Sequence, residues 1–179
     1  MLITHGEMLR KSFAPTDTSP WVARPASHER CMVCGEHRSC GLRFRVMAPN
    51  CVETTLVSGE KWQGYAGLMH GGMISTLLDA AMTHCLFNIG VEALTASLDI
   101  RFVEPIDCRA ELLLRAELRS RKRNLFCVYA EIIAGNRRVA HATARFLSGS
   151  PCISGNKQSC QMENVRSSLV SATPSETPQ

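Results

Sequence analysis

The sequence predicts an α+β fold in which an antiparallel β-sheet wraps around one long central helix. Two observations lead to this prediction. Residues 71–88 form the one long segment that is apolar around most of a helix, and four segments between residues 93 and 147 alternate apolar and polar side chains as β-strands do. Strands joined by short turns run antiparallel, and a sheet with one apolar face needs a cover. The helix is the element that can supply this cover.

The individual strands follow from the same alternation. Residues 42–47 and 52–57 are expected as strands before the helix, and 93–102, 110–119, 126–132 and 137–147 after it. The pair Gly135-Asn136 suits a tight hairpin between the last two. We therefore expect the last four strands to form a meander, each pairing with its neighbour in the chain.

Composition places the chain among single-domain globular proteins. It has 179 residues, of which 45% are hydrophobic and 20% charged. No apolar run approaches the roughly 20 residues of a membrane span, and the N-terminus lacks the features of a signal peptide. The nine cysteines are odd in number and partly lie in apolar patterns, which indicates a reducing compartment. We expect a cytoplasmic protein that does not bind membranes.

Three regions are expected along the chain. Residues 1–30 are broken by prolines and are interpreted as an N-terminal extension, and residues 31–148 as the folded domain. Residues 149–179 are rich in Ser, Thr, Pro, Gly and Asn and are interpreted as a flexible C-terminal tail, because they cannot bury enough apolar surface.

A glycine-rich loop at residues 64–72 leads directly into the apolar helix. The free N–H groups at a helix start can bind an anionic oxygen. Two turns later the helix has a single carboxylate, Asp79, in a polar stripe with Ser75, Thr76 and Thr83. A carboxylate on a largely buried helix is costly without a function. The combination suggests hydrolysis of an activated acyl group; a solvent-facing aspartate is the alternative.

The spacing of the loop and the acid adds a constraint. Gly71 and Asp79 are eight residues apart, which is about 12 Å along a helix. Both therefore cannot act on one carbonyl from the same helix. A second copy running antiparallel would bring Asp79 of one chain near the helix start of the other, which predicts a dimer with two composite sites.

These residues resemble a known family. The sequence Gly-Leu-Met-His-Gly-Gly at 67–72, the helix with Asp79, and the segment 94–102 followed by Pro105 resemble the hotdog-fold acyl-CoA thioesterases of the phenylacetyl-CoA thioesterase (PaaI-like) type. The resemblance covers roughly residues 31–148. It implies an antiparallel sheet around a central helix, an acyl-CoA substrate with no further cofactor, and dimers, often paired into tetramers, with sites at the dimer interface.

The resemblance also implies roles for single residues. Asp79 would be the general base or the nucleophile, and the Gly71 N–H would polarise the thioester carbonyl. Thr95 would help to hold the water, and His70 would shape the loop and orient nearby groups.

Substrate-binding residues are implied in two places. Gln63 and Gly72 would lie near the thioester. The turn Arg121-Lys122-Arg123-Asn124 matches the region that meets the CoA nucleotide in relatives. The net charge of +4 is small, and no aromatic residues interleave with the basic ones, so we expect no nucleic-acid partner.

The cysteine-rich segment has two interpretations. Cys31, Cys34 and Cys40, with His28 and His37 nearby, are residue types that bind zinc. A second Cys-x-x-Cys pair is missing, however, and the spacing is irregular, so packing and turn roles are favoured and no metal is expected.

Two rival functions remain open. A non-catalytic acyl-CoA binding or sensing protein could use the same fold, although residues 1–30 are too short and proline-broken for a helix-turn-helix. A hydratase or dehydratase is a weaker alternative, because the spacing of His70 and Asp79 does not fit the usual motif of that chemistry.

Overall fold

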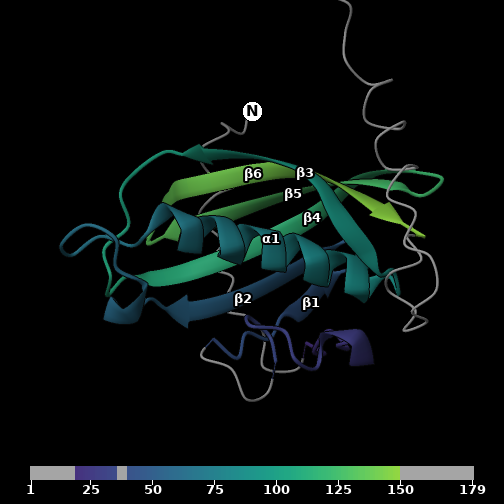
Figure 1. Cartoon of the computed structure of the whole chain (residues 1–179), viewed down its shortest axis with the longest axis horizontal. Coiled ribbons are helices and arrows are strands. Elements are labelled where there is room, and N and C mark those ends of the chain that lie inside the picture. Colours follow the sequence, from purple (N-terminus) through teal and green to yellow (C-terminus); the bar gives the residue numbers. More distant parts are fainter. Residues whose placement is uncertain (1–18, 36–39, 150–179) are drawn as a thin grey trace, which may run out of the picture. The chain divides into compact units, whose positions relative to one another are not determined.

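The computed structural model describes residues 19–35 and 40–149, and shows one antiparallel sheet with a long helix, α1, lying across one face (Figure 1). The helix spans Gly71–Asn88. The strands are β1 (Arg45–Ala48), β2 (Cys51–Val57), β3 (Ala93–Phe102), β4 (Glu111–Lys122), β5 (Leu125–Ala134) and β6 (Arg137–Ser148), and the 3₁₀ turns are η1 (Ala26–His28) and η2 (Glu60–Trp62). The predicted tail at 150–179 and the first 18 residues lie outside the described residues.

The six strands follow the order β1-β2-β4-β5-β6-β3, and every pairing is antiparallel. This confirms the predicted fold class. The predicted meander is correct for β4, β5 and β6 but wrong for β3, which pairs with β6 instead of β4. Both edges of β4 are taken by β2 and β5, so β3 occupies the outer edge of β6.

The hydrophobic core lies between α1 and the sheet face that it covers. The alternation predicted from sequence is confirmed on β4, where Leu112, Leu114 and Ala116 are buried. Shifts in strand register occur in the β3–β6, β4–β5 and β5–β6 pairings. Such bulges bend strands and increase their twist, which helps the sheet to curl around the helix. The fully buried helix residues Leu77, Leu78 and Met82 fill this curve.

The described part of the N-terminal segment, residues 19–35, packs against the domain. The Val22 N–H donates to the Phe44 carbonyl at 2.8 Å, and Trp21 forms a bridge with Arg45. The His28 ring packs edge-on against Phe87 of α1, with 4.8 Å between centroids. This segment therefore forms part of the surface next to the helix. Among the described residues, no helix combines the length and hydropathy that crossing a membrane requires.

Candidate active site

The start of α1 leaves one backbone donor free. His70 caps the helix: its Nδ1 accepts the Gly72 N–H at 2.9 Å. A Cβ on Gly72 would lie 2.9 Å from that nitrogen, so the cap requires glycine there. The Gly71 N–H has no acceptor among the described residues. Gly71 is thus the donor available to an oxyanion, while Gly72, which was also predicted to bind substrate, is engaged by the cap.

The loop before the helix is held in place by backbone and side-chain bonds. The Gln63 Oε1 accepts the Gly67 N–H at 2.8 Å, and the His70 N–H donates to the Trp62 carbonyl at 2.7 Å. The Met69 N–H donates to the Ile106 carbonyl at 2.9 Å. The Gln63 side-chain oxygen is thus engaged within the loop, and the Gln63 backbone pairs with Met69, two residues before the helix begins.

Asp79 and Thr95, to which the resemblance gave separate roles, lie in contact. The Thr95 Oγ1 on β3 donates to the Asp79 Oδ1 at 2.7 Å. Asp79 is half-buried, and its second carboxylate oxygen accepts no hydrogen bond from the described residues. Two other hydroxyls of the polar stripe bond within the helix: Ser75 donates to the Gly71 carbonyl and Thr76 to the Gly72 carbonyl, both at 2.9 Å. Asp79 is therefore the stripe residue that offers a free carboxylate oxygen.

A groove of about 420 Å³ runs beside this carboxylate on the α1 side of the sheet. Its lining combines α1 residues with Leu98 of β3 and with the N-terminal segment: His28, Cys31, Met32, Val33, Cys34, Ser75, Thr76, Asp79, Ala80, Thr83, His84 and Leu98. Most of this wall is apolar or only weakly polar. A carboxylate at the side of an apolar groove can act on a polar group attached to an apolar chain.

His84, at the bottom of this groove, is a core histidine. Its Nδ1 lies 2.8 Å from the Ala80 carbonyl, and its ring stacks on Phe44 with centroids 4.6 Å apart. Burial lowers the pKa of His84 to about 4, so the imidazole is neutral near pH 7. The neutral ring donates to Ala80 and takes no part in proton transfer to the groove.

Three further titratable groups line the N-terminal wall of the groove. Burial lowers the pKa of His28 and raises the pKa of the Cys34 thiol to about 12, the hydrogen bond with Cys31 adding to the latter shift. Cys40 lies outside this cluster, and His37 lies outside the described residues. On α1, burial likewise raises the pKa of Cys85 to about 12, which argues against a cysteine nucleophile there.

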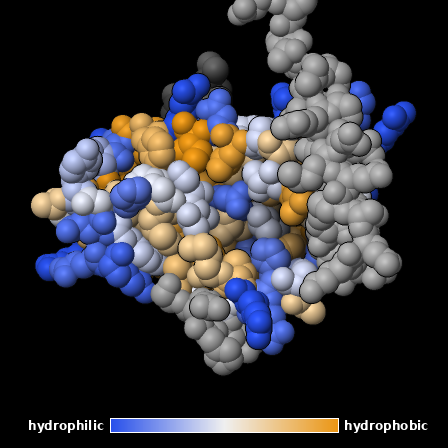
Figure 2. All heavy atoms as spheres, viewed as in Figure 1, coloured by the Kyte–Doolittle hydropathy of each residue, from blue (hydrophilic) through white to orange (hydrophobic). Residues whose placement is uncertain are grey.

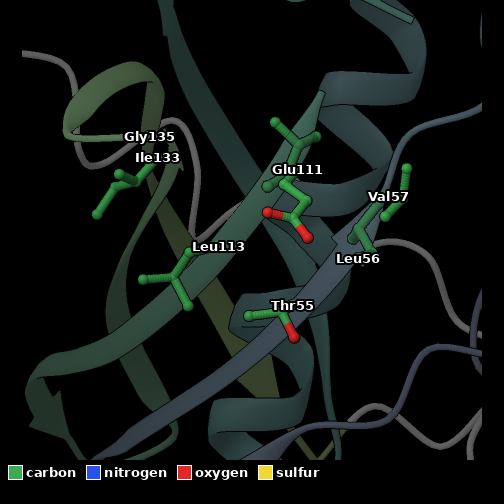
Figure 3. Close-up of a pocket in the computed structure, with 8 residues that line it drawn as sticks. Thr55, Leu56, Val57, Glu111, Leu113, Ile133 and Gly135 are labelled. Carbon is green, nitrogen blue, oxygen red and sulfur yellow. The ribbon is translucent and has the colours of Figure 1, made fainter. Parts of the chain in front are cut away.

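A second hollow, of about 550 Å³, lies on the opposite face of the sheet. Figure 3 shows the side chains of Thr55, Leu113 and Ile133 on strands β2, β4 and β5, turned away from α1. Glu111 is the one carboxylate in its lining; Thr55 also lines it but makes no hydrogen bond to Glu111, and no helix start lies there. We therefore do not assign the chemistry to this hollow, although it is the larger.

The basic turn 121–124 joins β4 to β5 at the end of the sheet where α1 ends (Figure 1). The Asn124 carbonyl accepts the Ser148 N–H, and Ser148 pairs with Ala93, which begins β3 soon after the helix. Gly71, by contrast, begins the helix at its other end. Within one chain, the structure does not bring the turn to the oxyanion donor.

Sequence reasoning missed part of the groove wall. Met32, Val33 and Leu98 line it, and nothing in the local pattern marks them as substrate-facing. The sequence placed Cys40 in one cluster with Cys31, Cys34 and His28, whereas the structure brings only His28, Cys31 and Cys34 of these together. The regular spacing His-x-x-Cys-x-x-Cys could have indicated this grouping.

Comparison with known proteins relates this chain to thioesterases. The family model described as "Thioesterase superfamily" matches residues 66–141, which include the loop, α1 and β3 to β5. The rat acyl-coenzyme A thioesterase THEM4 is 30% identical over 95 residues, covering 52% of this chain and 41% of the relative. The mouse protein of the same name is 31% identical over 118 residues, covering 62% and 51%. The chain thus spans about half the length of these curated relatives.

Solved structures share the fold. A hypothetical thioesterase from Streptococcus pneumoniae, solved with coenzyme A, superposes with a TM-score of 0.57 at 21% identity, covering 59% of this chain and 86% of that one. The Escherichia coli PaaI protein gives a TM-score of 0.56 at 19% identity, covering 58% and 80%. The resemblance seen in the sequence is confirmed: residues 66–141 match the thioesterase superfamily model, and the antiparallel sheet with its single long helix is the hotdog fold of these solved structures.

Proposed function

We propose that this domain hydrolyses an acyl-CoA thioester to a free acid and CoA. The observation that carries the proposal is the Asp79–Thr95 pair, whose carboxylate has a free oxygen beside an apolar groove. The names of the rat and mouse relatives support the reaction, and the Streptococcus pneumoniae and Streptococcus mutans neighbours, solved with coenzyme A and acetyl-CoA, support the ligand. Two solved variants of the Streptococcus pneumoniae protein replace an aspartate and a threonine that are 16 residues apart, the separation of Asp79 and Thr95.

The reaction uses the two ends of the site in different ways. The Thr95 hydroxyl orients the Asp79 carboxylate, whose free oxygen takes a proton from water as that water attacks the thioester carbonyl. The carbonyl oxygen becomes an oxyanion, which the Gly71 N–H and the helix start stabilise. The C–S bond then breaks, and the CoA thiolate leaves and gains a proton. Direct attack by Asp79, with hydrolysis of an acyl-aspartyl anhydride, is the alternative route.

Each site would combine two chains. Asp79 and Gly71 are about 12 Å apart along α1, too far to share one carbonyl. β3 forms an outer edge of the sheet and exposes Leu94 and Phe102, with Val103 just beyond it. Figure 2 shows apolar surface on this side of the molecule, near the β3 edge. An exposed apolar edge strand favours pairing with a second chain, which supports an antiparallel dimer.

The groove and the basic turn suggest the substrate class. The apolar wall and a volume of about 420 Å³ suit an aromatic or a short- to medium-chain acyl group. In an antiparallel dimer, the turn 121–124 of one chain lies toward the α1 start of the other. Its exposed cations can then contact the phosphates of CoA.

Replacement of the acid tests the proposal. Asp79→Asn keeps the size of the side chain but removes the base, so we expect kcat for acyl-CoA hydrolysis to fall by about 10³-fold or more. Glu111→Gln, which removes the carboxylate of the outer hollow, is the matched control and should leave kcat unchanged. Equal activity of wild type and Asp79→Asn would contradict the proposal. Tight acyl-CoA binding by the wild type without turnover would instead support the sensing function.

Mixed dimers test whether the sites are composite. Asp79→Ala and Gly71→Pro chains should each be inactive alone. Co-expressed, they form some dimers in which one site has the Asp79 of one chain and the Gly71 of the other, so about a quarter of wild-type activity should return. No recovery in dimers shown to be mixed would place each site within a single chain.

A further inference from the structure

The groove wall opposite α1 contains three converging metal-ligating side chains. Atoms offered by His28, Cys31 and Cys34 all lie within 4.8 Å of one another, and the Cys34 Sγ is 3.7 Å from the His28 Nδ1. In a tetrahedral zinc site with Zn–S near 2.3 Å and Zn–N near 2.0 Å, sulfur and nitrogen ligands are about 3.5 Å apart. We propose that His28, Cys31 and Cys34 bind a zinc ion, independently of the acyl-CoA reaction.

The local backbone brings these ligands together. η1 ends at His28, whose carbonyl accepts the Cys31 N–H at 3.1 Å, and the Gly35 N–H donates to the Cys31 carbonyl at 2.9 Å. A Cβ on Gly35 would lie only 2.5 Å from the Cys31 carbonyl oxygen, so the turn requires glycine. The cluster is therefore fixed by the fold of the segment as well as by side-chain rotamers.

One ligand sulfur is already held by a backbone contact. The Val33 N–H points at the Cys31 Sγ, with nitrogen and sulfur 3.4 Å apart. This contact helps to hold the sulfur in place beside the turn. Val33 itself is buried in the core, which fixes the direction of this donor.

The donor set selects the ion. Two thiols and one imidazole suit zinc, whereas calcium and magnesium prefer oxygen ligands. On binding, both thiols lose their protons to solvent, and two thiolates neutralise the charge of Zn²⁺ while His28 stays neutral. A disulfide between Cys31 and Cys34 is the competing use of the pair. A disulfide would need an oxidant, and it would not explain why the His28 ring lies close to both sulfur atoms.

The site would stiffen a wall of the groove. All three ligands line the same groove as Asp79, and His28 also packs against Phe87 of α1. Zinc would tie the turn at 31–35 to η1 and so to the helix. Three protein ligands leave a fourth tetrahedral position, which water can fill.

From the sequence, packing roles and no metal were favoured for these cysteines, because a second cysteine pair is missing. In the structure, His28 supplies the third ligand.

Metal content and cobalt spectra of the full chain test the proposal. Protein purified without chelator should contain about one zinc per chain. Replacement by Co²⁺ should give thiolate-to-cobalt charge-transfer absorption and tetrahedral cobalt bands. Both signatures should be lost in Cys31→Ser and Cys34→Ser, and kept in Cys40→Ser, the matched control from the same segment. His28→Asn should weaken metal affinity at least 10-fold.

The remaining outcomes contradict the proposal. Equal metal content in wild type and Cys31→Ser would indicate adventitious binding. Loss of metal in Cys40→Ser as well would show a different ligand set. A metal-free wild type with a Cys31–Cys34 disulfide by mass spectrometry would assign the pair to redox chemistry. Circular dichroism of each variant identifies any that fails to fold, and Cys31, which is only half-buried, is the safer of the two cysteines to replace.

Discussion

The inner groove beside Asp79 and the hollow on the outer face of the sheet differ in what their walls can do. The hollow on the outer face is larger, about 550 Å³ against about 420 Å³, and is built from the side chains of three neighbouring strands. The groove on the inner side combines a helix, an edge strand and the N-terminal segment. In this groove, elements that are distant in sequence bring together the Asp79 carboxylate, the Thr95 hydroxyl bonded to it and an apolar wall.

The difference favours the junction of elements, more than the larger volume, as the place of the proposed chemistry. On the outer face the lining side chains project from one side of the sheet, and no side chain of the described residues donates a hydrogen bond to Glu111. At the edge of α1, the Asp79 carboxylate meets the Thr95 hydroxyl of another element at 2.7 Å. If the inner groove is the site, substitutions there should change activity or stability strongly, and a substitution in the outer hollow should change them little.

The largest further effect is expected at the helix start. Gly71→Pro removes the free N–H but suits the first position of a helix, and His70 before it is already extended (φ −65°, ψ 133°). We expect kcat to fall about 10²- to 10³-fold, the usual cost of losing one oxyanion donor. Gly71→Ala keeps the N–H, and its Cβ would make ordinary contact with Phe102 at 3.7 Å. Steady-state kinetics of both should separate them; equal losses would point to backbone distortion.

The buried imidazole under the groove should make stability depend on pH. The folded pKa of His84, about 4, lies below its ordinary value of 6.5, so folding favours the neutral ring. Its contribution is fully present above pH 6.5 and is lost as the pH falls toward 4, by about 3 kcal/mol in the free energy of unfolding. Urea unfolding between pH 7 and 4, with chelator present, measures this loss. His84→Asn should show a flatter profile, and identical slopes would contradict the assignment.

The hydroxyl partner of the acid should have a smaller effect. Thr95→Val removes the donor to Asp79 but preserves the branched shape. A hydrogen bond to a charged group is worth about 1.5–3 kcal/mol, so kcat should fall about 10- to 100-fold. Thr95→Ser retains the hydroxyl and should recover most of the activity. If Thr95→Val and Thr95→Ser are equally active, the bond at 2.7 Å does not orient the acid.

The smallest effect is expected in the outer hollow. Leu113→Thr places a polar, branched side chain on the strand face turned away from α1. We expect kcat/KM within about twofold of wild type and a modest loss of stability. A 10-fold loss of activity in a correctly folded variant would show that this face takes part in substrate binding or assembly. The inner groove and the outer hollow would then not differ in function.

Local patterns were enough for most of the fold. The predicted helix at 71–88 has the observed bounds, because its glycine-rich start and apolar periodicity are contained within the segment itself. The alternation in β4, β5 and β6 is local in the same way. The partner of β3 is different: it depends on which strand edges remain free once the other strands have paired, which no single segment encodes.

The candidate site also has features that a local sequence pattern predicts and features that depend on tertiary structure. Motif and spacing pointed to Asp79, Gly71 and Thr95, and the structure brings the first and the last together. They did not reveal that His70 occupies the Gly72 N–H, since capping geometry depends on the rotamer of one side chain. The N-terminal wall of the groove escaped prediction because residues 28–34 meet α1 only through tertiary packing.

The apolar side chains exposed on β3 also bear on how the activity of the proposed two-chain site should scale with protein concentration. A site assembled from two chains forms by a second-order process, so on dilution below the dissociation constant of the pair, turnover falls with the square of concentration. Specific activity then becomes a measure of assembly. Substrate that bridges the two chains should hold them together, because any ligand that binds only the assembled form shifts the equilibrium toward it.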